Sequence, residues 1–156
     1  MWNSIQSYEE ECLVDISKNA EILGVYNINL DEKFDSFVRD IYKHDESIAQ
    51  WKIDKKLETL NSYENKNVTI LFLNVNVNKT IYHKGKKREV YINSERLKNS
   101  LRNKYSKKIL NYFPDNIFHM TDDENEFEKI YPIIISYLNE YNQQVDIGVQ
   151  RIRKGC

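Results

Sequence analysis

The feature that most constrains the fold is a β-prone run at 68–75, which reads Val-Thr-Ile-Leu-Phe-Leu-Asn-Val. The run is nearly all apolar and does not alternate with polar residues, which is typical of a strand covered on both faces. Strands of this kind lie in sheets that carry helices. The run therefore predicts an α/β fold, with a small sheet whose central strand lies near 68–75 and which is packed by helices.

Helical periodicity precedes this run. Apolar residues spaced by three and four predict helices over 4–22, 34–41 and 48–60. Trp51 belongs to the apolar stripe of the third helix, and Gly24 with the polar residues of 27–29 separates the first two. We therefore expect a helical N-terminal third, residues 1–62.

A second group of elements follows the run. Residues 80–83 and 88–92 flank a polar turn with one Gly and predict a hairpin. Ser94 is then expected to cap a helix, because an apolar stripe at intervals of four follows it: Leu97, Leu101, Tyr105 and Ile109. Lys98 and Arg102 lie along one flank of that stripe.

The last elements meet at a histidine. Residues 116–120 predict a short strand that ends at His119 and leads into Thr121-Asp-Asp-Glu124, the pattern of a helix capping box. The following helix contains Pro132, which is expected to kink or divide it. The tail at 143–156 has weak periodicity and is expected to be mobile.

Length and composition indicate a folded globular protein. The 156 residues are expected to form a single domain, 1–156, with its sheet-containing portion at 66–141. No apolar stretch approaches the ~20 residues of a membrane span, so we expect no membrane partner. The two cysteines, Cys12 and Cys156, provide neither a disulfide framework nor metal-ligand spacing, which favours a cytoplasmic location.

Charge is unevenly distributed along the chain. The net charge is −1, but the segment 79–108 holds eleven Lys and Arg residues against Glu89 and Glu95. Such a basic block can attract an anion such as a phosphate, a nucleotide or a nucleic acid. A solubilising helix face with a Lys-rich turn is the simpler explanation of the block.

His119 is the strongest candidate for chemistry. A side chain at the end of a strand and beside a helix N-terminus occupies the usual ligand position of α/β folds. Neutral imidazole is a nucleophile, while the free N–H groups of the helix and the cations Lys98 and Arg102 attract phosphoryl oxygens. The alternative is a histidine that is hydrogen-bonded in a purely structural role at the strand end.

Two segments resemble nucleoside diphosphate kinases. Residues 116–122, Asn-Ile-Phe-His-Met-Thr-Asp, resemble the Asn-x-x-His-Gly-Ser-Asp signature of that family, with Met120 at the Gly position. Residues 101–105 resemble the family's Ile-Arg-Gly-Asp-Phe/Tyr segment. The resemblance as a whole covers about 40 residues at best, roughly a quarter of the chain, and the Lys-Pro-Asp-Gly motif of the family has no counterpart here.

The resemblance implies a phosphotransferase, active or degenerate. His119 would accept a phosphoryl group from a nucleoside triphosphate, and Mg²⁺ would be held mainly by the nucleotide's own phosphates. Arg102 would bind phosphate and Asn116 would lie near the sugar, while Thr121 and Asp122 would support the histidine loop. The basic residues Lys98 and Arg88 are further phosphate-binding candidates.

Two alternatives stay open. His119-Met120-Thr121 is one copy of the His-x-Thr unit that two-histidine phosphoesterases use twice, but the sequence has no second copy. The second alternative is a non-catalytic binding module, in which the basic segment 79–108 contacts a nucleic acid or a protein partner. The sequence leaves open whether a second copy of the chain is such a partner.

Overall fold

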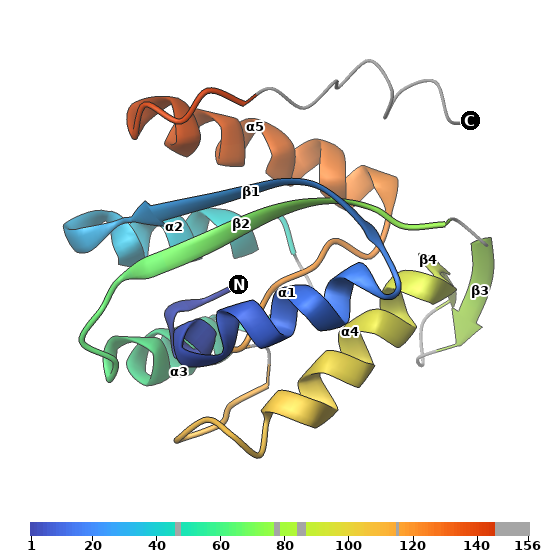
Figure 1. Ribbon diagram of the computed structural model, residues 1–156, viewed down its shortest axis with the longest axis horizontal. Helices are drawn as coiled ribbons and strands as arrows, with labels where there is room; N and C mark the ends of the chain where they lie inside the picture. Colours follow the sequence, from blue (N-terminus) through green and yellow to red (C-terminus); the bar gives the residue numbers. More distant parts are fainter. Residues whose placement is uncertain (46–47, 77–78, 84–86, 115, 146–156) are drawn as a thin grey trace.

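A two-stranded antiparallel ribbon lies at the centre of the protein. The structure is a computed structural model that describes residues 1–45, 48–76, 79–83, 87–114 and 116–145. The ribbon consists of β1 (Glu21–Asn29) and β2 (Asn67–Asn74), with Tyr26 opposite Ile70. In Figure 1, α5 (Glu124–Glu140) lies along one side of the ribbon, and α1 (Glu9–Ser17) and α4 (Ile92–Tyr105) lie along the other. The predicted α/β class, with a strand near 68–75, is confirmed.

β2 has apolar residues at successive positions because helices cover both of its faces. Ile70 and Phe72 pack in a cluster with α2 (Phe34–Tyr42), α3 (Gln50–Asn61) and α5. Leu71 and Leu73 contact a second cluster, formed with α1 and α4. Thr69 is buried as well, and its hydroxyl donates a 2.8 Å hydrogen bond to Glu9 of α1. Successive side chains of a strand point to opposite faces of the sheet. A strand that helices cover on both faces therefore has apolar residues at consecutive positions.

The predicted first helix, 4–22, is wrong in its second half. A 3₁₀ helix, η1 (Asn3–Tyr8), precedes α1, which ends at Ser17, and residues 21–29 form β1. Tyr26 and Ile28 contribute to the first cluster from alternate positions of this strand, and Ile22, beyond an irregularity of the pairing between Ile22 and Gly24, contributes to the second. Gly24 does not end an element but lies within β1, where an added β-carbon would be 2.8 Å from the Tyr26 ring. Helices still account for most of the predicted N-terminal helical portion.

Other helices differ from the prediction in detail. α2 and α3 are present, with the short 3₁₀ helix η2 (Asp31–Lys33) before α2. Trp51 does not enter the core: its side chain is 62% exposed, whereas Ile53 and Leu57 of the same helix are buried. Ser94 does not cap α4 but lies in its first turn. The stripe of Leu97, Leu101 and Tyr105 is buried as predicted.

The remaining elements lead to the site. The predicted hairpin is confirmed as β3 (Lys79–His83) and β4 (Lys87–Tyr91), which pair antiparallel. Residues 116–120 form no strand, and α5 continues through Pro132 without being divided. Residues 146–156 of the predicted mobile tail lie outside the described residues. In the described part of the chain, no helix has both the length and the apolarity needed to cross a bilayer.

Candidate functional site: an apolar cavity beside strand β2

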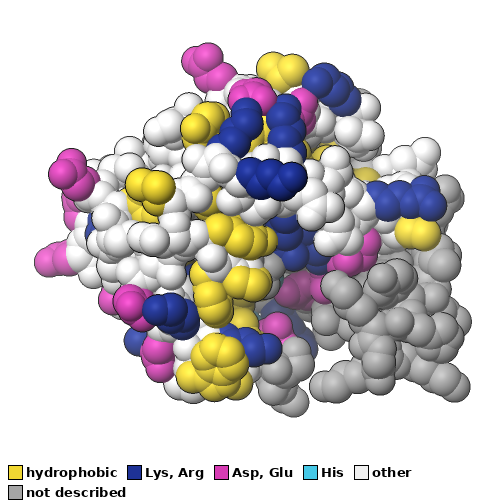
Figure 2. Space-filling model, turned by 90° about the horizontal axis from the view of Figure 1, so that it is seen from below, with side chains coloured by type: hydrophobic (Ala, Val, Ile, Leu, Met, Phe, Trp, Pro, Cys, Tyr) yellow, Lys and Arg dark blue, Asp and Glu magenta, His cyan; other side chains and the backbone are white. Residues whose placement is uncertain are grey.

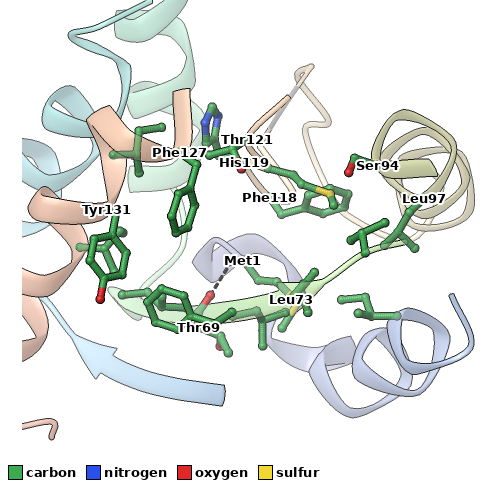
Figure 3. Close-up of a pocket in the computed structure, with 18 of the residues that line it drawn as sticks. Met1, Thr69, Leu73, Ser94, Leu97, Phe118, His119, Thr121, Phe127 and Tyr131 are labelled. Atoms are coloured by element: carbon green, nitrogen blue, oxygen red, sulfur yellow. Dashed lines mark hydrogen bonds between the residues drawn. The ribbon is translucent and has the colours of Figure 1, made fainter. Parts of the chain in front are cut away.

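A cavity of about 950 Å³ lies beside β2, and its size is within the usual range for ligand pockets. In Figure 3, β2 runs along one side of the cavity and segment 118–121 lies opposite. Phe127 and Tyr131 of α5 flank it at one end, and Ser94 and Leu97 of α4 at the other. The cavity is therefore a slot between the ribbon and the segment that carries His119.

His119 lines this cavity with only 17% of its side chain exposed. Its Nε2 lies 3.2 Å from Oε1 of Glu126, which is ion-pair distance, although the two groups are not aligned as a hydrogen bond. The imidazole ring also meets the Tyr42 ring edge-on, with centroids 5.0 Å apart. Nε2 therefore faces Glu126, and the ring is held between Glu126 and Tyr42.

The start of α5 positions Glu126. The predicted capping box at Thr121 and Glu124 is wrong by two residues, because the N-cap is Asp123, whose Oδ1 accepts the Glu126 N–H at 2.8 Å. The Glu126 side chain reaches back and accepts the Asp122 N–H at 2.6 Å. The pattern Asp123-x-x-Glu126 is visible in the sequence, so capping arguments could have found Glu126. Nothing in the sequence indicated that it would also contact His119.

Lys98 is not available to bind a phosphate. Its ammonium forms ion pairs with Glu95 and with Asp122, and only 8% of its side chain is exposed. Two carboxylates already neutralise this buried cation. That Asp122 supports the histidine loop stays a prediction; its carboxylate pairs with Lys98, and its N–H is bonded to Glu126 of α5.

Arg102 and Asn116 lie away from the cavity lining. The Arg102 guanidinium lies over the Phe118 ring, with Cζ 5.5 Å from the centroid. Asn116 is fully buried, and its amide faces the Phe113 carbonyl at 2.7 Å and the Phe113 N–H at 3.2 Å. This geometry gives Asn116 a structural role in closing the turn before His119. Of the remaining candidates, Thr121 lines the cavity, and the side chain of Arg88 in β4 lies outside the described part.

The described lining of the cavity is apolar and acidic. It includes the carboxylates Glu21, Asp123 and Glu124, and none of its described residues is Lys or Arg. Two cations near the C-terminal end of α4 are engaged elsewhere: Lys104 and Lys108 pair with Glu11 of α1. On the face shown in Figure 2, Lys and Arg side chains accordingly lie next to Asp and Glu at several places.

The structure is thus that of a small α/β protein. Helices pack on both faces of an antiparallel ribbon, and an apolar slot lies along one edge of the ribbon. No family model, no curated protein and no solved structure matches this chain. Among the described residues, no group of three or more His, Cys, Asp or Glu side chains is placed to hold a metal ion.

Proposed function

We propose that this protein is a binding module that takes an apolar segment of a partner protein into the slot beside β2. The observation that carries the proposal is the chemistry of the lining. Ile70 and Phe72 provide apolar surface on one face of the ribbon, and Leu71 and Leu73 on the other. Apolar walls favour an apolar ligand because they release water when they are covered.

A neutral apolar dye such as Nile red tests whether the slot accepts such a ligand. Thr121→Trp places an indole in the slot from its rim, so we expect it to weaken dye binding about tenfold, equivalent to about 1.4 kcal/mol. Val14→Trp is the matched control because Val14 is 57% exposed and does not line the cavity. Leu97→Trp is a second blocking variant, and circular dichroism checks that each variant folds. Equal binding by all four proteins would contradict the proposal.

A second candidate function is histidine phosphotransfer. The pair of His119 and Glu126 favours it, because a nucleophilic imidazole held by a carboxylate is a recurring catalytic arrangement. In this reaction a ring nitrogen of His119 forms a bond to the terminal phosphorus of a nucleoside triphosphate, and the bond to the leaving nucleoside diphosphate breaks. Mg²⁺ carried by the nucleotide would offset the negative charge of its phosphates.

Incubation with ATP labelled on its terminal phosphate tests this candidate. The expected result is acid-labile, alkali-stable label on the protein that His119→Ala abolishes and His44→Ala leaves unchanged. His44 is an exposed histidine in the turn after α2. Absence of label on the wild-type protein would contradict phosphotransfer and leave the binding proposal unaffected.

A further inference from the structure

The edge of β2 that faces the slot carries unpaired backbone groups. Thr69 turns both its N–H and its C=O away from β1, since both are hydrogen-bonded to Met1. Backbone direction alternates along an antiparallel strand, so Leu71 and Leu73 turn their N–H and C=O groups to this same edge. Within the described residues, these groups of Leu71 and Leu73 have no hydrogen-bond partner.

The opposite side of the slot is unpaired as well. Phe118, His119 and Met120 all line the cavity, and in the described part of the chain none of their backbone groups forms a hydrogen bond. The sequence predicts a strand at 116–120, but the structure leaves this segment irregular. A β-strand requires a neighbour to pair with, and across the slot no described residue supplies one.

The first two residues of the chain show how the slot can be filled. Met1 pairs with Thr69 on one side, accepting its N–H at 3.0 Å, and the Trp2 N–H donates to the Ile117 carbonyl on the other side at 2.9 Å. Successive residues thus bond alternately to β2 and to the segment that leads to His119, as the residues of a middle strand do. One extended chain therefore bridges the gap at this end.

The slot has an apolar wall on each side of such an extended chain, so side chains from both faces of the chain can be buried. On one face lie Phe37 of α2 and Ile130 of α5, and on the other lie Leu97 and Leu101 of α4. A strand placed between these walls would send alternate side chains into the two apolar clusters. The edge of β2 from Leu71 to Asn74, together with Val75, which also lines the cavity, covers five residues, or about 17 Å of extended chain.

We propose that the partner binds by strand addition: an extended segment of a second protein inserts between β2 and residues 118–120. This inference rests on the proposed binding function and specifies its ligand. The inserted segment is apolar over about five residues, because both of its faces are buried. Lys or Arg flanks the apolar run, since the charged groups of the described lining include Glu21, Asp123 and Glu124.

The test uses the unmodified full chain and the blocked peptide acetyl-Lys-Val-Ile-Val-Ile-Val-Lys-amide, labelled with a fluorophore. We expect saturable binding by anisotropy, with slower amide hydrogen exchange at Leu71 and Leu73. Two control peptides separate the contributions: one is N-methylated at alternate residues, and the other has Glu in place of both Lys. N-methylation removes backbone donors and keeps the side chains, so it should weaken binding about tenfold for two lost hydrogen bonds.

The outcomes separate this inference from the binding function itself. If the N-methylated peptide binds as well as its parent and Thr121→Trp blocks both, the slot binds apolar ligands but strand addition is overturned. If neither peptide nor Nile red binds, both proposals fail. Equal binding of the Glu peptide overturns the charge preference. Slow exchange at Leu71 and Leu73 in the free full chain would show that the chain covers its own edge and would overturn the external partner.

Discussion

Glu126 connects His119 to the N-terminus of α5. Its Oε1 lies 3.2 Å from Nε2 of His119, while its Oε2 accepts the Asp122 N–H at 2.6 Å. One carboxylate thus faces the cavity histidine and also completes the cap of the helix that forms one wall of the slot. This relationship leads to the first prediction.

Glu126→Ala should lower the free energy of unfolding by about 1 kcal/mol, because the Asp122 N–H loses its acceptor. Glu126→Gln should cost less, since an amide oxygen can still accept that hydrogen bond. Urea denaturation measures both variants. Glu128→Ala is the control because Glu128 is exposed on the same helix. An equal loss for Glu126→Ala and Glu128→Ala would contradict the capping role.

Tyr42 and Lys56 form a buried pair behind His119. Lys56 is 1% exposed, and its ammonium donates a 2.5 Å hydrogen bond to the Tyr42 hydroxyl. Tyr42→Phe should therefore cost about 1.5–3 kcal/mol, the usual range for a hydrogen bond to a charged group. The cost should be smaller when Lys56 is already Met, which a double-mutant cycle measures. Tyr112→Phe, at a 41% exposed position, should have little effect. If the losses of stability in the two single variants simply add in the double variant, Tyr42 and Lys56 are not coupled.

Tyr137 should make the protein sensitive to alkali. Burial, followed by its hydrogen bond to Asp40, raises the pKa of Tyr137 to about 12. An unfolded chain loses this proton near pH ~10, so stability is complete below that pH and falls as the pH rises from about 10 to 12. The contribution of this group is at most about 1.4 kcal/mol per pH unit.

Stability curves at pH 9 to 11.5 measure this effect. Tyr137→Phe should flatten the alkaline decline, whereas Tyr112→Phe should leave it unchanged. An unchanged slope in Tyr137→Phe would show that the Tyr137 hydroxyl does not titrate differently in the folded and unfolded states.

Asp15 should act at the acid end of the pH range. Hydrogen bonds from Lys104, Lys18 and Tyr105 lower the pKa of the Asp15 carboxyl below its usual value. Its stabilising contribution is therefore present above pH ~4 and is lost as the pH falls below that value. Asp15→Asn should flatten the acid decline of stability, measured by urea denaturation between pH 2 and 5. Asp54→Asn, at a surface pair with Arg39, should change it much less. Identical acid curves for the two variants would count against Asp15 as a link between α1 and α4.

Local sequence signals predicted which helices and strands are present more reliably than the residues at which they begin and end. Residues 68–75 predicted a strand buried on both faces because their apolar side chains pack in clusters on the two faces of the strand. β1 was missed because Ile22 extends the helical spacing of the preceding residues and Gly24 reads as an interruption. Residues 21–29 form a strand because they pair with β2 along the ribbon, as Tyr26 does with Ile70.

The sequence predicted that a helix follows His119, but the helix begins only at Glu124 and the surroundings of His119 were not predicted. Lys98 and Arg102 were expected to provide positive charge, but Lys98 is buried between two carboxylates and Arg102 lies over Phe118. The sequence spacing of charges along a helix cannot show which acids other elements bring to them. Whether His119 accepts a phosphoryl group stays a prediction.

By itself, the sequence determined the α/β class, the doubly buried strand, the hairpin and the helix that follows His119, because these depend on local propensity and on the period of apolar residues. The tertiary structure alone decided that, within the described residues, the edge of β2 stays unpaired at Leu71 and Leu73, that the described lining of the slot contains no Lys or Arg, and that Glu126 meets His119. These features depend on contacts between residues distant in the chain, whose geometry is set by the packing of the helices around the ribbon.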